Sequence, residues 1–238
     1  MALNAAFFDA VRSSLFGGTL SSEQVAALEA ISDAWARYGD GDPAKLAYVL
    51  ATAFHETARF KFMREVWGPT AAQERYEGRA DLGNTVAGDG KKFLGRGFVQ
   101  ITGRRNYSDW SRRLGIDLLK EPQLTEQVDV AARVLVEGMM LGTFTGRKLA
   151  DYVTAAGTDY RNARRIVNGL DRADDIAGYA RSFAAALAKA GKPVPRPSPP
   201  AEAKPPPVTT PVARRGVPAA IIILIIALAA AGAFFFLR

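Results

Sequence analysis

The chain of 238 residues contains no cysteine and only one histidine, His55. The absence of cysteine excludes disulfides, a cysteine nucleophile and zinc sites built on thiolates. A single histidine also excludes metal centres that need several. The dipeptide His55-Glu56 begins like the zinc-protease motif HExxH, but Arg59 stands where that motif requires its second histidine. We therefore expect no metal site.

Phosphate-binding loops are also missing, because neither GxxxxGK[ST] nor GxGxxG occurs in the sequence. The formal net charge of +7 is unevenly distributed. Residues 1–190 contain 25 Lys and Arg against 23 Asp and Glu, whereas residues 191–238 contain six against one. The excess positive charge thus belongs to the C-terminal part, where it can attract anionic lipid headgroups. We expect no nucleic-acid partner.

Composition divides the chain into three parts. Residues 1–190 have the composition of a globular domain. Residues 193–211 hold nine of the thirteen prolines, so 191–216 is predicted to be a proline-rich linker that favours extended structure. Residues 217–237 carry no charge, and a helix from Ala219 to Leu237 would span roughly 28 Å, close to the thickness of a bilayer core. This segment is predicted to be a single transmembrane helix in contact with lipid.

The globular part is predicted to be mainly helical, with little β structure. Ser21 and Gln24 form a capping-box pattern ahead of residues 25–39, and Asp42-Pro43 is typical of a helix start ahead of residues 44–58. Residues 78–97 are rich in glycine and charge and suggest a loop or a short hairpin. Two further helices are expected, over residues 128–140 and 174–190.

Two glutamates are candidates for acid–base chemistry. Glu56 lies between Phe54 and Phe60 at the end of an apolar helix, where desolvation disfavours the ionised form, as a general acid requires. Glu65 follows nine residues later in a more polar setting. Such a pair suits glycoside hydrolysis, although two glutamates at this spacing are common in proteins without that activity. A lone helical histidine such as His55 is more often a structural hydrogen-bonding residue.

The segment 88–110 contains side chains suited to sugars. Glycines allow the backbone to approach a ligand closely, and amide, hydroxyl and aromatic side chains suit sugar hydroxyls and ring faces. The residues of interest are Gly95, Gly97, Gln100, Thr102, Gly103, Asn106, Tyr107 and Trp110.

Three stretches together resemble glycoside hydrolase family 19, in particular its bacterial and phage endolysin branch: AFHETARFKFMREVW, GNTVAGDGKKFLGRGFVQITGRRNY and ARRIVNGLDRADDIAGYARSF. The resemblance covers roughly residues 40–188. It implies a lysozyme-like, two-lobed helical fold with the substrate between the lobes. Around Glu65 the sequence reads REVWG instead of the ENLNY common in the family.

The resemblance also implies roles for individual residues. Glu56 matches the general acid, Glu65 the general base, and Thr102 the hydroxyl residue that helps to hold the attacking water. His55, Gln100, Asn106, Tyr107, Asn168 and Arg172 are the residues expected to bind the glycan. The family inverts the anomeric configuration, so the carboxyl groups are expected about 6.5–9.5 Å apart. No organic cofactor is needed.

The implied substrate is a β-1,4-linked N-acetylhexosamine polymer, with peptidoglycan favoured over chitin. A catalytically inactive, membrane-anchored glycan-binding protein is the alternative from another functional class. We expect the chain in the inner membrane of a bacterium, acting on the periplasmic wall. Arg214 and Arg215 precede the apolar segment, so the positive-inside rule favours a cytoplasmic catalytic domain. A cytoplasmic catalytic domain would be separated from a periplasmic substrate by the membrane. Release of the domain with the help of a holin is one hypothesis that reconciles the two.

Overall fold

The structure is a computed structural model that describes residues 3–191. The predicted transmembrane helix at 217–237 and nearly all of the predicted linker at 191–216 therefore lie outside the described residues. Within residues 3–191, no helix is both long and apolar enough to cross a membrane.

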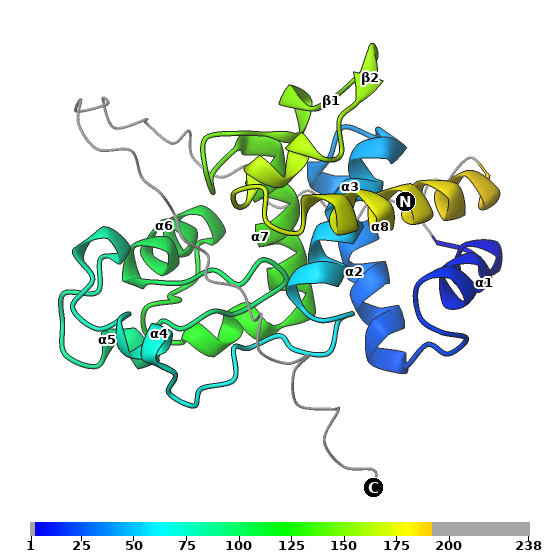
Figure 1. The fold of residues 1–238 in the computed structure, drawn as a ribbon. Helices are drawn as coiled ribbons and strands as arrows, with labels where there is room; N and C mark the ends of the chain where they lie inside the picture. The colour runs from blue at the N-terminus through cyan, green and yellow to red at the C-terminus, as the bar shows by residue number, and fades with distance from the viewer. Residues whose placement is uncertain (1–2, 192–238) are drawn as a thin grey trace, which may run out of the picture.

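The described residues are mainly helical, as predicted (Figure 1). The α-helices are α1 (Ala5–Ser14), α2 (Ser22–Tyr38), α3 (Pro43–Glu56), α4 (Ala71–Glu74), α5 (Asp89–Lys92), α6 (Arg104–Leu114), α7 (Val128–Leu141) and α8 (Ala173–Lys189). Short 3₁₀ helices are η1 (Ala80–Leu82), η2 (Pro122–Glu126), η3 (Leu149–Asp151) and η4 (Asn162–Ile166). The strands β1 (Val153–Thr154) and β2 (Gly157–Thr158) form a small antiparallel pair.

The predicted helix starts of α2 and α3 are confirmed. Ser21 accepts a hydrogen bond from the backbone N–H of Gln24, and the Gln24 side chain accepts one from the backbone N–H of Ser21. Asp42 caps α3 by accepting from the N–H of Ala44, with Pro43 in the first turn. These caps satisfy backbone donors that have no partner within the helix, which is why both helices begin where they do.

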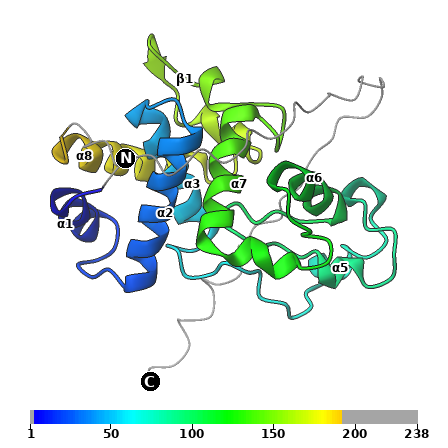
Figure 2. The same cartoon turned by 180° about the vertical axis from the view of Figure 1, so that it is seen from behind.

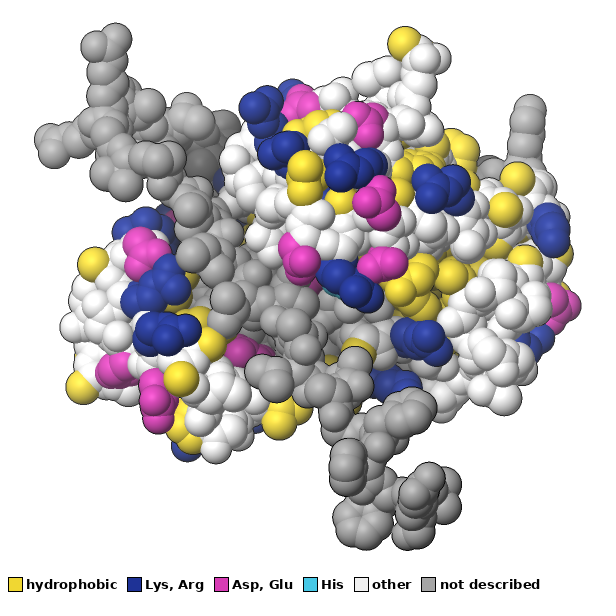
Figure 3. Space-filling view, viewed as in Figure 1, with side chains coloured by type: hydrophobic (Ala, Val, Ile, Leu, Met, Phe, Trp, Pro, Cys, Tyr) yellow, Lys and Arg dark blue, Asp and Glu magenta, His cyan; other side chains and the backbone are white. Residues whose placement is uncertain are grey.

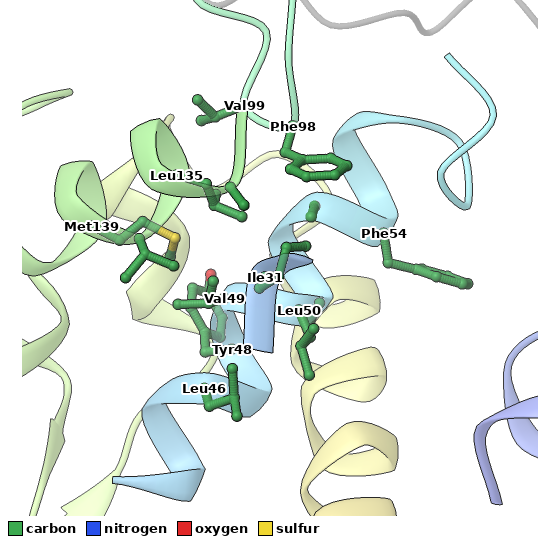
Figure 4. Packing of buried hydrophobic residues seen from close by; sticks show 14 of the residues in the cluster. Ile31, Leu46, Tyr48, Val49, Leu50, Phe54, Phe98, Val99, Leu135 and Met139 are labelled. Atoms are coloured by element: carbon green, nitrogen blue, oxygen red, sulfur yellow. The ribbon is translucent and has the colours of Figure 1, made fainter. Parts of the chain in front are cut away.

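Helix α3 forms the centre of the core. Every residue from Lys45 to Phe54 is buried, so this helix is apolar on nearly all sides and other elements surround it. It packs along α8, while α2 packs along α7. Figure 4 shows Val49 and Leu50 of α3 in the same buried cluster as Ile31, Leu135 and Phe98 from elsewhere in the chain. Helix α3 thereby holds its C-terminal residue, Glu56, in a fixed position.

The helices form two groups that both views separate. Helices α1, α2, α3 and α8 lie on one side and α4, α5 and α6 on the other, with α7 between them (Figures 1 and 2). Residues 57–70 run from the end of α3 into the second group. This arrangement agrees with the expected two-lobed helical architecture.

Of the two structures expected for residues 78–97, a loop or a short hairpin, the loop is the one observed. Residues 78–97 form a loop containing η1 and α5, and no hairpin. Gly83 and Gly88 adopt positive φ there and interrupt any extended run. Helix α6 was not expected, because the polar sequence RRNYSDWSRRL has few apolar positions. It buries only Tyr107 and Trp110, and Gly103 and Gly115 bound it.

Candidate active site

Glu56 ends helix α3 and is 2% exposed. Its Oε1 accepts a hydrogen bond from Nη1 of Arg164, a residue of η4 that lies 108 positions away in the sequence. The Nε of Arg164 also donates to the carbonyl of Asp171 at 3.2 Å. Both side chains of the ion pair are 1% exposed. Within residues 3–191, Oε2 of Glu56 and Nη2 of Arg164 are buried without a hydrogen-bond partner.

This environment favours the protonated form of Glu56. Burial raises the pKa of the Glu56 carboxyl, and the positive charge of Arg164 opposes that rise only in part. The charge of Asp171 adds to the rise. A carboxyl group with a raised pKa can carry the proton that a general acid donates.

His55 precedes Glu56 and is half-buried. Burial, and then the charges of Arg164 and Arg172, lower the pKa of His55 to about 4, so the imidazole is neutral at neutral pH. Its Nε2 has no hydrogen-bond partner among the described residues. The structural hydrogen bond expected for His55 is therefore not seen at this nitrogen, and the ring lies 6.5 Å from that of Tyr179.

The backbone after Glu56 adopts a strained turn. Ala58, Arg59 and Phe60 all have positive φ, at 48°, 65° and 62°. Each such residue costs about 1–2 kcal/mol relative to a right-handed conformation. Thr57 stabilises the turn through its hydroxyl, which donates to the Ala53 carbonyl and accepts from the N–H of Phe60. The turn directs the chain away from α3 toward Glu65.

Glu65 is held by three donors. Its Oε1 accepts from Nε2 of Gln73 at 3.0 Å and from the hydroxyl of Tyr76 at 3.2 Å, and its Oε2 accepts from the N–H of Gly95 at 3.1 Å. The N–H of Glu65 in turn donates to the Gly95 carbonyl at 2.9 Å. These contacts fix the carboxylate against the segment that begins at Gly95.

Gln100 lies on the other side of Gly95. A Cβ placed on Gly95 would be 2.9 Å from Oε1 of Gln100 and 3.3 Å from Oε2 of Glu65, so only glycine fits between these two side chains. Gln100 has a φ of 52°, and its Nε2 donates to the Gly97 carbonyl at 2.8 Å. The close approach expected from the glycines of this segment is thus present at Gly95.

Thr102 and Asn106 continue from Gln100. The Thr102 hydroxyl donates to the Gln100 carbonyl at 3.0 Å, and Nδ2 of Asn106 donates to the Thr102 carbonyl at 2.7 Å. Both side chains are partly exposed. Glu65, Gln100, Thr102 and Asn106 therefore form one connected group.

Tyr107, Asn168 and Arg172, which were also expected to bind the glycan, are not part of the group around Glu65. Tyr107 is 0% exposed; its hydroxyl donates to the Leu94 carbonyl and accepts from Arg96, so this side chain packs in the core. Asn168 accepts from the N–H of Gly169 at 2.8 Å. Arg172 precedes α8 and forms an exposed ion pair with Asp175.

The contacts thus define two groups of candidate residues. The first contains His55, Glu56 and Arg164, and the second is centred on Glu65. The aromatic rings of Phe60 and Phe98, 5.9 Å apart, connect the two segments that carry these groups. Sequence reasoning missed Arg164, Gln73 and Tyr76. Arg164 lies within the third stretch that resembles the family but was given no role, and Thr70 with Gln73 forms a capping-box pattern that could have placed α4. Neither pattern shows that these side chains reach Glu56 or Glu65.

The fold is that of the family 19 chitinases. A crystal structure of a bacterial family 19 chitinase superposes with a TM-score of 0.52 and 21% identity, covering 78% of this chain and 94% of that one. A class IV chitinase of family GH19 from Zea mays gives a TM-score of 0.50 and 18% identity, covering 76% and 92%. At these identities the likeness establishes the fold, which is helical and lysozyme-like, and nothing further.

Sequence similarity is confined to shorter segments. An endochitinase of Arabidopsis thaliana is 31% identical over 80 residues, which are 34% of this chain and 29% of that protein. A glycosyl hydrolase family 19 domain-containing protein of Haemophilus influenzae is 36% identical over 66 residues, 27% of this chain and 32% of that protein. The chain thus spans about a third of the length of these relatives. No family model matches it.

Proposed function

We propose that the chain is a glycoside hydrolase of the family 19 type that cleaves β-1,4 bonds between N-acetylhexosamine units of peptidoglycan. The observation that carries this proposal is the environment of Glu56. A carboxyl group at the end of a buried helix, with a pKa raised by desolvation and a single arginine as its ion-pair partner, suits a general acid. The fold and the names of the similar proteins support the same class of reaction.

In the proposed mechanism, Glu56 donates its proton to the glycosidic oxygen as the bond to the anomeric carbon breaks. Arg164 orients the carboxyl through Oε1, and after proton transfer its positive charge stabilises the carboxylate that forms. Oε2, which has no partner among the described residues, is the oxygen available to carry the proton.

Glu65 is the proposed general base. Its carboxylate accepts a proton from a water molecule, which attacks the anomeric carbon on the opposite face of the sugar and inverts its configuration. The three donors around Glu65 keep the carboxylate in place during this step. Thr102 is proposed to hold the water, and His55, Gln100, Asn106, Asn168 and Arg172 to contact the glycan. Tyr107, buried in the core, is proposed to support this segment from beneath.

The inverting mechanism has a direct test. Proton NMR of the first product released from a β-linked oligosaccharide should detect the α anomer before mutarotation. A β anomer as the first product would mean retention, through a glycosyl-enzyme or an intermediate formed by the substrate's own N-acetyl group, and would refute the role of Glu65 as the base of an inverting reaction.

Chitin is the second candidate substrate, because the two structural neighbours and the plant relative are named as chitinases. Mass spectrometry of digested sacculi separates the candidates. New reducing ends at MurNAc or GlcNAc in muropeptides support peptidoglycan, and their position identifies the bond that is cut. Products from chitooligosaccharides alone would establish chitin instead. If neither polymer is cut but sacculi are bound, the chain is a glycan-binding protein.

We further propose that residues 217–237 anchor the chain in the inner membrane and that the basic residues around this segment contact anionic lipids. A catalytic domain kept on the cytoplasmic side would need release, for example through a holin, before it reached the wall. Protease treatment of intact spheroplasts tests this topology. Protection of the catalytic domain supports retention inside, whereas digestion without membrane damage means that it is already exported.

A further inference from the structure

A pocket of about 540 Å³ opens beside the turn that follows Glu56, and the catalytic mechanism does not use it. It lies between this turn and the connection from α1 to α2. Its walls combine apolar, basic, acidic and amide side chains. The lining residues that matter here are Phe16, Leu20, Phe60, Arg59, Lys61 and Glu23.

The charged side chains of this pocket have no partners of opposite charge. Within residues 3–191, neither Arg59 nor Lys61 forms a salt bridge, and neither does Glu23. The guanidinium of Arg59 lies over the Phe54 ring, 5.9 Å from its centroid, and this contact leaves its hydrogen-bond donors available to a ligand. In Figure 3, basic side chains flank a hydrophobic patch on the front face, over the part of the molecule that contains the α1–α2 connection.

The strained turn fixes the shape of this pocket. Phe60 is held in the core against Phe16, Phe54 and Phe98, so the side chains on either side of it, Arg59 and Lys61, remain at the surface. Nε2 of Gln24 donates to the Arg59 carbonyl at 2.9 Å and joins the turn to α2. Strained backbone of this kind concentrates at catalytic sites and ligand-binding sites.

The pocket is also within reach of the proposed reaction centre. Arg59 is three residues after Glu56, so their Cα atoms are at most about 11 Å apart. A four-residue peptide in extended form reaches about 13 Å. A four-residue peptide on a sugar beside Glu56 is therefore long enough to span the separation between Glu56 and Arg59.

We propose that this pocket binds the peptide stem of peptidoglycan, with Arg59 and Lys61 holding its carboxylates and Glu23 holding the ammonium group of its diamino acid. The apolar walls take its alanine methyl groups. This inference rests on the proposed function, because it assigns peptidoglycan rather than chitin as the substrate. Chitin carries no peptide and no carboxylate. A phosphate polymer of the wall would pair with Arg59 and Lys61, but the negative charge of Glu23 would repel it.

Calorimetric titration of the full chain with a soluble muramyl tetrapeptide that contains a diamino acid tests the proposal. The wild-type chain should bind, and Arg59→Gln/Lys61→Gln should weaken binding at least tenfold. Arg181→Gln/Lys189→Gln, which removes the same two kinds of charge from the exposed face of α8, is the matched control and should bind as the wild type does. Absence of wild-type binding, or equal binding by the Arg59/Lys61 variant, overturns the proposal.

A second variant tests the role of Glu23 and does not depend on the stability of the turn. Glu23→Gln should weaken binding of the tetrapeptide but leave unchanged the weaker binding of the same peptide with its side-chain amine acetylated. Equal loss for both peptides overturns the assignment of Glu23. Preferential binding of soluble wall teichoic acid over the tetrapeptide also overturns the proposal, in favour of a phosphate site.

Hydrolysis assays distinguish failure of this inference from failure of the proposed function. The wild-type chain should cut peptide-bearing glycan strands faster than strands stripped of peptide by an amidase, and Arg59→Gln/Lys61→Gln should remove that difference. If the wild type cuts both kinds of strand at equal rates, the pocket proposal fails and the glycosidase proposal survives. If it cuts neither, nor chitooligosaccharides, the proposed function fails.

Discussion

Replacing Arg164 by methionine should destabilise the protein strongly and in a pH-dependent manner. The side chains of Arg164 and Glu56 are both 1% exposed, so the variant leaves a buried carboxylate without its counter-charge. Removing one partner of such a pair costs about 3–5 kcal/mol at neutral pH. For a domain of this size, each kcal/mol lowers the melting temperature by about 2–4 °C, so a fall of about 6–20 °C is expected.

The pH dependence separates loss of charge from loss of packing. Burial already raises the pKa of Glu56, and without Arg164 it rises further. The folded state then holds the proton more tightly than the unfolded state. The stabilisation linked to that proton is complete below the unfolded pKa of about 4.3 and is lost as the pH rises through the folded pKa. The deficit of the variant relative to wild type should therefore be small near pH 4 and large at pH 8.

Thermal unfolding followed by circular dichroism between pH 4 and pH 8 measures this difference. Arg172→Met is the matched control, because the ion pair of Arg172 with Asp175 is 60% and 44% exposed, and such pairs contribute about 0–1 kcal/mol. Adding Glu56→Gln to Arg164→Met should restore part of the lost stability at pH 8. A pH-independent deficit, or one no larger than that of the control, would refute the proposed buried ion pair.

Three other predictions concern activity. Glu56 must be protonated to act as the acid, and its pKa is raised. The kcat of the wild type should therefore remain at its maximum at pH values above the ordinary glutamate pKa of about 4.3, and should fall as the pH rises through the raised pKa. A fall in kcat centred at or below about pH 4.3 contradicts this prediction. Gly95→Ala places a methyl group 3.3 Å from Oε2 of Glu65, so kcat should fall about 10–100-fold. Gly178→Ala is the control: its added methyl group meets no neighbouring atom within 4 Å, so kcat should not change. Tyr76→Phe removes one donor to Glu65, worth about 0.5–1.5 kcal/mol, so kcat should fall about 2–10-fold and the melting temperature by about 1–6 °C.

Local sequence signals predicted the parts of the fold that depend on neighbouring residues. Ser21 with Gln24 and Asp42 with Pro43 place the starts of α2 and α3, because capping involves atoms only two or three residues apart. Helix α6 gave no such signal. Its position depends on burying Tyr107 and Trp110 against distant segments, and its other residues remain polar.

The candidate site also combines features that the sequence predicted with features that it did not. The apolar flanks of Glu56 and the glycines before Gln100 were visible in the sequence, and both features have structural counterparts. The ion pair with Arg164 joins residues 108 positions apart, and the donors to Glu65 come from the four-residue helix α4, the turn after it and Gly95. Contacts of this kind arise only from tertiary packing, so composition and spacing could not predict them.

The central claim is that Glu56 acts as the general acid of a glycoside hydrolase. The most direct test measures reducing ends released from sacculi and from chitooligosaccharides by the wild-type chain and by Glu56→Gln, with circular dichroism confirming that the variant is folded. Glutamine cannot donate the proton, so the rate should fall about 10²–10⁴-fold on whichever polymer the wild type cuts. A folded Glu56→Gln variant that releases reducing ends at the wild-type rate would contradict the account.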